Sequence, residues 1–243
     1  DENDENQKQI LINAIKNLDE PISNLNFFNS FLQSQNAKLD DCKVILTGDG
    51  ADEIFGGYSH YSRLLKLKKI ARFIPLNLRI KLSELAISNL DIGLRGRNYI
   101  RILGTDFKNY IPRINIFFDK EYIERLGPFF KKEYITNTKG KGPEISKDFI
   151  NTILKDDFNN YLPENILSKI DRTSMQNSVE ARSPFLNYKL IEYVFKNIPS
   201  SKKISHKDRK IILKALAKKY LPTDFNYSRK QGFSIPLNEW LKK

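Results

Sequence analysis

The 243-residue sequence has few of the side chains that crosslink a chain or bind transition metals. It contains one cysteine, Cys42, and two histidines. A single cysteine cannot form an internal disulfide, and these three side chains are too few for a zinc cluster. Disulfides and structural zinc are therefore excluded as sources of stability.

Long hydrophobic runs are also missing from the sequence. No stretch of about 18 apolar residues occurs, so we predict no membrane-spanning helix and no membrane partner. The first six residues are acidic and polar, opposite in character to a secretory signal or a transit peptide. We therefore expect a cytoplasmic protein.

The composition is that of a globular protein with an excess of basic residues. Hydrophobic residues make up 40% and charged residues 29%, which excludes extensive disorder and allows one sizeable core or two small domains. The net charge of +12 would suit a polyanion. However, the basic residues are dispersed and are not interleaved with aromatics as in RNA-binding proteins. We expect mainly solvated charge, no specific nucleic acid, and a nucleoside triphosphate if any polyanion binds.

Apolar spacing predicts a mostly helical chain with one strand. Val44 to Thr47 form a short, continuous apolar run that stops at Gly48, as strands buried on both faces do. Its partner strands are expected to be absent or supplied from outside the chain. The Gly-rich segment 139–143 is predicted to be a surface loop. Helices are predicted over residues 7–18, 27–39, 64–73, 76–90, 150–158, 166–178, 188–196 and 207–220.

The strongest local motif is the turn at 47–58, Thr-Gly-Asp-Gly-Ala-Asp-Glu-Ile-Phe-Gly-Gly-Tyr. Gly48 and Gly50 flank Asp49, so a ligand could closely approach the backbone there. Asp49, Asp52 and Glu53 would repel one another unless a cation lies among them, and Mg²⁺ carrying phosphate oxygens fits that demand. Alternatively, Asp49 or Asp52 caps the following helix.

A second motif spans residues 169–186. Arg172 and Arg182 offer forked donors suited to a carboxylate or a phosphate. The alternative is a structural ion-pair network that also includes Asp171 and Glu180.

Two further segments carry basic side chains near the end of the chain. Lys210 lies at the margin of the apolar face predicted for the helix 207–220, where its ammonium could enter a cleft or remain solvated. The segment 228–240 combines Arg-Lys with Gly-Phe, and could clamp an anion or dock on the core.

Taken in this order, the four segments resemble glutamine-dependent asparagine synthetases. Residues 47–58 are similar to the family block S/T-G-E/D-G-x-D-E-x-F-G-G-Y, and 171–186 to D-R-x-S-M-x-x-S-x-E-A-R-x-P-F-L. Residues 210–222 and 230–237 match K-x-x-L-R/K and K-x-G-F-x-x-P-L. The resemblance spans nearly the whole chain and is weakest over 66–162.

This resemblance implies a fold and a set of partners. The fold would be the mainly α-helical remainder, with few strands, of an α/β adenylating domain of the PP-loop ATPase-like class. Residues 1–243 would be a partial synthetase domain without the amino-terminal glutaminase domain and the pyrophosphate loop, and the chain alone is expected to be inactive. Its protein partner would be the missing amino-terminal half or a second copy.

The resemblance also implies a reaction. ATP would activate aspartate as β-aspartyl-AMP, and ammonia from glutamine would convert this to asparagine. Asp49 would help form the intermediate, Asp52 would bind Mg²⁺, and Lys210 would stabilise charge on the phosphates. The cofactor-binding residues would be Thr47, Gly48 and Gly50.

Two departures and two rival hypotheses accompany this assignment. Asp49 stands where the family often has Glu, which shortens its reach, and Asn187 stands where Asp is common. A β-lactam synthetase or a sugar-modifying amidotransferase would share the adenylating core. A non-catalytic fragment acting as an interaction module is the other alternative.

Overall fold

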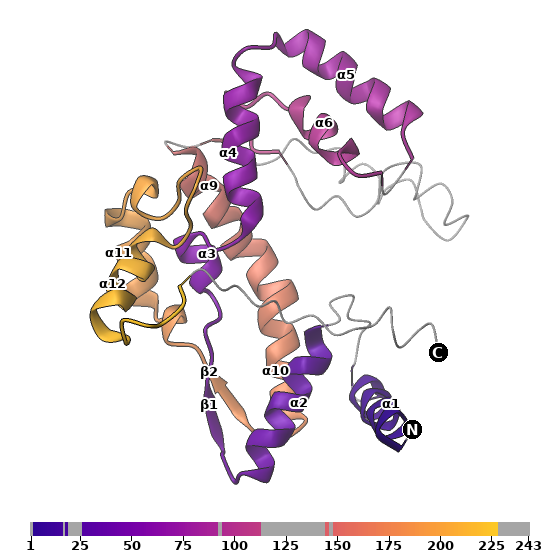
Figure 1. Cartoon of the computed structure of the whole chain (residues 1–243), viewed down its shortest axis with the longest axis vertical. Coiled ribbons are helices and arrows are strands. Elements are labelled where there is room, and N and C mark those ends of the chain that lie inside the picture. The colour runs from indigo at the N-terminus through magenta and orange to yellow at the C-terminus, as the bar shows by residue number, and fades with distance from the viewer. Residues whose placement is uncertain are drawn as a thin grey trace. The chain divides into compact units, whose positions relative to one another are not determined.

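The computed structural model describes residues 2–16, 18, 26–91, 94–112, 144–145 and 148–227 (Figure 1). Within these ranges the chain is mostly helical with few strands, as predicted. It divides into two compact units. The first unit comprises residues 1–56, 157–199 and 212–243, and the second comprises 57–156 and 200–211. The predicted loop 139–143 and the segment 228–240 lie outside the described residues.

The first unit is built around a parallel strand pair. Its helices and strands are α1 (Glu2–Lys16), α2 (Asn26–Leu39), β1 (Val44–Leu46), α3 (Ala51–Phe55), the π-helix η3 (Asp157–Leu167), α10 (Ser168–Met175), β2 (Glu180–Arg182), the 3₁₀-helix η4 (Pro184–Leu186), α11 (Tyr188–Asn197) and α12 (Ile211–Tyr220), which joins this unit at residue 212.

The second unit is helical in its described part. Its elements are α4 (Ser59–Ala71), α5 (Leu76–Asn89), α6 (Arg97–Leu103), α9 (Phe149–Asp156) and the 3₁₀-helix η5 (Ser200–Lys202). Arg79 of α5 is buried and donates hydrogen bonds of 2.7 and 2.6 Å to the carbonyls of Leu103 and Thr105. This side chain therefore ties α5 to the end of α6.

Strand β2 was not predicted from the sequence. β1 pairs with it in parallel, with Val44 opposite Glu180 and Leu46 opposite Arg182. The expectation of a strand without a partner is therefore wrong for one edge of β1. Glu-Ala-Arg is short and polar, so neither its length nor its residue types indicate a strand.

The prediction that β1 is buried on both faces is also wrong. Val44 is 42% exposed and Leu46 is 75% exposed, whereas Ile45 is half-buried. The helices α2 and α10 pack against each other, and α10 also contacts β2 (Figure 1). Among the described residues, cover is present on the side of Ile45 and not on the side of its two neighbours.

Aromatic side chains form much of the core of the first unit. Phe27, Phe28 and Phe31 of α2 pack with Ala14 of α1 in one cluster. A second cluster joins α3 to α11 through Ile54, Phe55 and Val194. Burying each Phe side chain contributes about 1.5–3 kcal/mol, so these helices are held by packing rather than by propensity alone.

Two predicted helices differ from the structure. α12 begins at Ile211 rather than at 207, because Lys210 has φ +52° and the N–H of Ile211 donates to the carbonyl of Lys203 instead of to that of Lys207. The helix predicted over 166–178 is instead the end of η3 followed by α10, which stops at Met175. Pro163 lies inside η3 and cannot donate a backbone hydrogen bond, which fits a π-helical segment.

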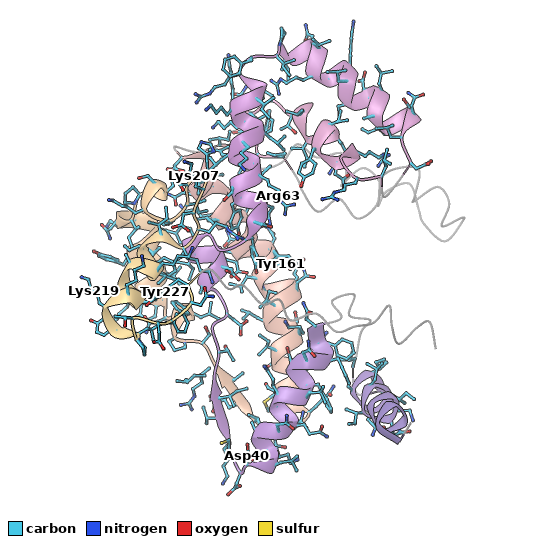
Figure 2. All side chains as sticks on the ribbon, viewed as in Figure 1. Asp40, Arg63, Tyr161, Lys207, Lys219 and Tyr227 are labelled. Carbon is cyan, nitrogen blue, oxygen red and sulfur yellow. The ribbon has the colours of Figure 1, made fainter. Side chains whose placement is uncertain are left out.

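The surface carries exposed lysines, as the dispersed basic composition predicts. Lys207 and Lys219 are two examples (Figure 2). Across the described ranges, no helix has both the length and the hydropathy needed to cross a bilayer.

Candidate functional site

The acidic turn connects β1 to α3 in the first unit. The backbone N–H of Thr47 extends the strand pair by donating to the carbonyl of Arg182 at 2.8 Å. The chain then turns through residues 48–50, and the N–H of Ala51 bonds to the carbonyl of Gly48 at 3.3 Å. Asp49 therefore stands at the carboxyl end of β1, as predicted.

The two glycines of the turn have different structural roles. Gly50 has φ +84°, and an added Cβ would lie 2.5 Å from Cδ2 of Leu186. Both its conformation and its packing therefore require glycine. At Gly48 an added Cβ would meet nothing within 4 Å. The space needed for a ligand to approach the backbone is thus found at Gly48, whereas a ligand contact at Gly50 stays a prediction.

The carboxylates of the turn occupy different environments. Gly50 takes the N-cap position of α3, so the alternative that Asp49 or Asp52 caps this helix from that position is wrong. Glu53 is buried, whereas Asp49 and Asp52 are half-buried. Asp52 and Glu53 lie in the first turn of α3, where the partial positive charge of the helix end favours acids.

Tyr161 of η3 adds a phenol to this acidic region. Burial raises the pKa of Tyr161, and the charges of Glu53, Asp157 and Asp52 raise it further. Tyr161 was not predicted as a site residue, since nothing in the neighbouring sequence indicates that η3 contacts α3.

Asp49 also borders a cavity of about 490 Å³. Three of the predicted site residues, Thr47, Gly48 and Asp49, line it together, and Gly50 and Asp52 are not among its lining residues. The opposite walls come from α2 and α10 and include Ser30, Gln33, Ser34, Lys169 and Thr173.

Lys169 is the cation of this cavity and was missed as a site residue. Only 8% of it is exposed. Burial lowers the pKa of its ammonium, and the nearby Asp49 carboxylate opposes this shift. Its position four residues before Thr173, on one helical face, was visible in the sequence, but its burial was not.

Residues 183 and 186 of the second motif contact the acidic turn. The hydroxyl of Ser183 donates to the backbone carbonyl of Asp49 at 2.5 Å. Leu186 covers Gly50, as described above. The resemblance grouped these two motifs, and the structure brings them into contact.

The paired arginine and glutamate of this motif form a surface ion pair. Nε and Nη2 of Arg182 donate to the two carboxylate oxygens of Glu180 at 2.8 and 3.0 Å. Their mutual interaction lowers the pKa of Glu180 and raises that of Arg182. Both side chains are more than half exposed, so the structural alternative is confirmed for this pair.

Asn187, the second departure from the family pattern, has a structural role. It is the N-cap of α11, and its Oδ1 accepts a hydrogen bond of 3.0 Å from the N–H of Lys189. Asn and Asp cap helices about equally well, so this difference leaves the local structure intact.

Lys210 lies in the second unit, outside any helix. It has φ +52°, and α12 begins only at the next residue. The predicted position on a helix face is therefore wrong. On one side of it, Arg209 donates to the carbonyl of Gly57 at 3.0 Å, and on the other the N–H of Ile211 donates to the carbonyl of Lys203 at 3.0 Å.

No group of three or more metal-binding side chains converges anywhere in the described part of the chain. Mg²⁺ is usually held by one or two carboxylates together with phosphate oxygens and water. Binding of Mg²⁺ at Asp52 therefore stays a prediction, and it would need phosphate oxygens and water as further ligands.

Comparisons with known proteins agree with the motif assignment. A family model described as asparagine synthase matches residues 3–243. The chain is 32% identical over 203 residues to the glutamine-hydrolyzing asparagine synthetase 1 of Bacillus subtilis, which covers 82% of this chain and 32% of the relative. It is 29% identical over 230 residues to putative glutamine-hydrolyzing asparagine synthetases of Mycobacterium bovis and Mycobacterium tuberculosis, covering 93% of this chain and 34% of each relative.

No solved structure matches the chain significantly. The chain spans about a third of the length of the curated relatives it matches. Because the family model covers almost every residue, the chain belongs to the asparagine synthase family.

Proposed function

We propose that this chain is the carboxyl-terminal part of a synthetase domain that makes asparagine from aspartate, ATP and ammonia released from glutamine. The observation that carries this proposal is the cavity at the end of β1, where Thr47, Gly48 and Asp49 face the buried Lys169. An accessible backbone, a carboxylate and an ammonium within one small cavity suit a substrate that carries both signs of charge.

In the proposed first step, the β-carboxylate of aspartate attacks the α-phosphorus of ATP, and pyrophosphate leaves. Gly48 leaves room for the nucleotide against the backbone, with Thr47 and Gly50 completing the predicted nucleotide contacts. The carboxylate of Asp49 orients the substrate aspartate by contacting the α-ammonium group of that substrate. Mg²⁺, if held by Asp52, would neutralise negative charge on the departing pyrophosphate.

In the proposed second step, ammonia attacks the acyl carbon of β-aspartyl-AMP, and AMP leaves as asparagine forms. Lys210 stabilises negative charge on the phosphates in both steps. Its backbone is fixed by the bonds that Arg209 and Ile211 make on either side of it.

The complete enzyme would contain further parts outside residues 1–243. The curated relatives are about three times as long, which supports an amino-terminal glutaminase domain and a pyrophosphate loop outside these 243 residues. Residues 1–243 would then be one part of a PP-loop ATPase-like domain whose further strands extend the sheet beside β1. We place this reaction in the cytoplasm.

A second candidate function is a non-catalytic interaction module. The exposure of Val44 and Leu46 on a sheet of two strands favours it, because apolar strands with open edges associate with other chains.

One experiment separates these candidates. The chain is mixed with a protein that supplies the glutaminase domain and the pyrophosphate loop, and aspartate-dependent exchange of labelled pyrophosphate into ATP is measured. We expect exchange in the mixture and none with the chain alone. A folded complex that shows no exchange would support the interaction module. Exchange that requires a β-amino acid or a sugar acid in place of aspartate would indicate one of the rival amide-forming enzymes.

A further inference from the structure

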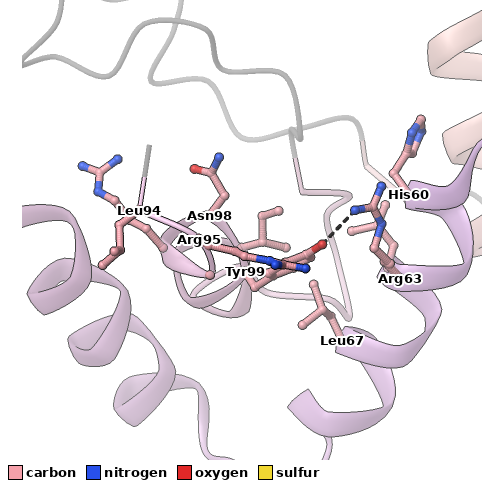
Figure 3. Close-up of a pocket in the computed structure, with 11 residues that line it drawn as sticks. His60, Arg63, Leu67, Leu94, Arg95, Asn98 and Tyr99 are labelled. Carbon is pink, nitrogen blue, oxygen red and sulfur yellow. Dashed lines mark hydrogen bonds between the residues drawn. The ribbon is translucent and has the colours of Figure 1, made fainter. Parts of the chain in front are cut away.

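A second cavity lies within the second unit, and none of its lining residues is used in the proposed reaction. It has a volume of about 300 Å³ and is lined by residues of α4, the segment 94–96 and α6 (Figure 3). This is the lower end of the range for small-molecule sites. The cavity therefore has room for a compact organic molecule.

The floor of this cavity is apolar. It is formed by Leu64 and Leu67 of α4 and Ile102 of α6, which are 1%, 8% and 5% exposed. These side chains are fixed by the packing of the two helices. They provide a preformed surface for the apolar body of a ligand.

The rim of the cavity is basic. Arg63 and Arg95 contribute guanidinium groups, His60 adds an imidazole, and no acidic residue is among the described side chains that line the cavity. Arg97 also lines it, but its side chain is buried and donates to the carbonyl of Ile87 at 3.1 Å. Like charges gathered around a low-dielectric surface create a positive potential. An anion that entered the cavity would relieve this repulsion.

Arg63 is held in a fixed orientation. Nη1 donates to the hydroxyl of Tyr99 at 2.8 Å, and Nη2 donates to the hydroxyl of Ser59 at 2.7 Å. Nε makes a longer bond of 3.4 Å to the carbonyl of Ser59. Figure 3 shows Arg63 reaching from α4 to Tyr99 on α6.

This arrangement leaves donors for a ligand. A guanidinium has five N–H groups, of which these contacts use three, so two remain on the terminal nitrogens. The Tyr99 hydroxyl accepts from Arg63 and keeps its own hydrogen for an acceptor. The remaining N–H groups of Arg63 and the neighbouring hydroxyl of Tyr99 are donors that match the oxygens of a carboxylate or a phosphate.

We propose that the cavity between α4 and α6 binds a small organic anion. Its carboxylate or phosphate contacts Arg63, Tyr99 and Arg95, and its apolar body lies on Leu64, Leu67 and Ile102. The site shares no lining residue with the acidic turn. It therefore does not depend on the proposed synthetase activity.

The test uses the full chain and three probes: phenyl phosphate, benzoate and inorganic phosphate. Isothermal titration calorimetry measures each dissociation constant at low and at high salt. We expect phenyl phosphate or benzoate to bind at least tenfold more tightly than inorganic phosphate, because only the first two have an apolar body. The stronger of the two identifies the preferred anionic group. Binding is expected to weaken at high salt.

Variants then locate the site. Arg63→Gln and Arg95→Ala are each expected to weaken binding of the preferred probe at least tenfold, whereas Lys66→Ala, an exposed residue of α4 that does not line the cavity, serves as the control. Circular dichroism checks that the variants fold, and if Arg63→Gln does not, Arg95→Ala carries the test. Unchanged affinity in a folded Arg95→Ala and Arg63→Gln, or equal affinity for all three probes, would overturn the proposal.

Discussion

Lys203 and Asn151 are joined across 52 positions of sequence by a 2.9 Å hydrogen bond from Nζ to Oδ1, with the lysine completely buried. Nearby, the Ser200 hydroxyl donates to the carboxylate of Asp148 at 2.5 Å. Both bonds anchor the segment 200–211 on the start of α9. Because Ile211 bonds back to the carbonyl of Lys203, this anchor also fixes the backbone around Lys210.

The buried lysine predicts how stability depends on pH. The pKa of Lys203 is lowered from 10.5 to about 8, mainly by burial; the Asp148 carboxylate opposes this shift and the Lys155 ammonium adds to it. Between these two values the unfolded chain binds more protons than the folded chain. The contribution of Lys203 to the free energy of unfolding therefore rises with pH over this window and is constant below it.

Comparison with Lys203→Met isolates this effect. We expect the difference in free energy of unfolding between wild type and Lys203→Met to shift in favour of wild type between pH 7.5 and 9.5, as measured by urea denaturation. A difference that does not change with pH would mean that Lys203 keeps its ordinary pKa in the folded chain.

The acidic turn allows a matched pair of glycine substitutions. Gly50→Ala should destabilise the fold by about 2 kcal/mol or more, because φ is +84° and the new methyl group would overlap Leu186. Gly48→Ala should stay within about 1 kcal/mol, since nothing lies within 4 Å of its added Cβ. Thermal denaturation of both variants checks this. Equal destabilisation would show that the two glycines are constrained in the same way.

In the assembled enzyme, Lys210→Ala should lower kcat by a factor on the order of 100, with a smaller effect on the KM for ATP. Asp49→Ala should behave similarly. Lys207→Ala is the control, because this neighbouring lysine is exposed and lies in the same segment. Steady-state kinetics measures all three, and near-normal activity in Lys210→Ala would remove its catalytic assignment.

Arg209 is not a suitable control for that experiment. Its guanidinium donates to the carbonyl of Gly57, so it is not a solvated surface charge. Arg209→Ala is expected to lower the free energy of unfolding by about 1.5–3 kcal/mol, the range for a hydrogen bond from a charged group. The lost bond is the one that holds the segment beside Lys210.

Lys169 should affect stability and activity in different ways. Its ammonium is buried, and burial lowers its pKa, so Lys169→Met removes a desolvated charge while keeping a similar volume. We expect the free energy of unfolding to be unchanged or higher and pyrophosphate exchange in the assembled enzyme to fall at least tenfold. A variant that loses both stability and exchange would indicate that Lys169 supports the fold rather than the substrate.

Much of the site region could be predicted because it depends on local sequence. Strand β1, the turn after it and most helices follow from apolar spacing and from glycine positions, and the motif resemblance grouped Thr47 to Asp49 with residues 183–186. What escaped prediction depends on contacts between distant segments. The strand at 180–182 exists because β1 lies beside it. The importance of Lys169 and Tyr161 comes from the burial of the first and the partial burial of the second, which depend on the fold. Lys210 lies outside its predicted helix because its own φ is +52° and the next N–H, that of Ile211, bonds to the carbonyl of Lys203.

The contact between Ser183 and Asp49 has a consequence for the synthesis of this chain on the ribosome. The two residues are 134 positions apart. At roughly 5–20 residues per second, Ser183 is added roughly 7 to 27 seconds after Asp49. During that interval β2 is not yet available, and the edge of β1 that pairs with it is open to any unpaired strand nearby. The yield of native protein should therefore depend on the speed of translation and on the chaperones that meet the nascent chain.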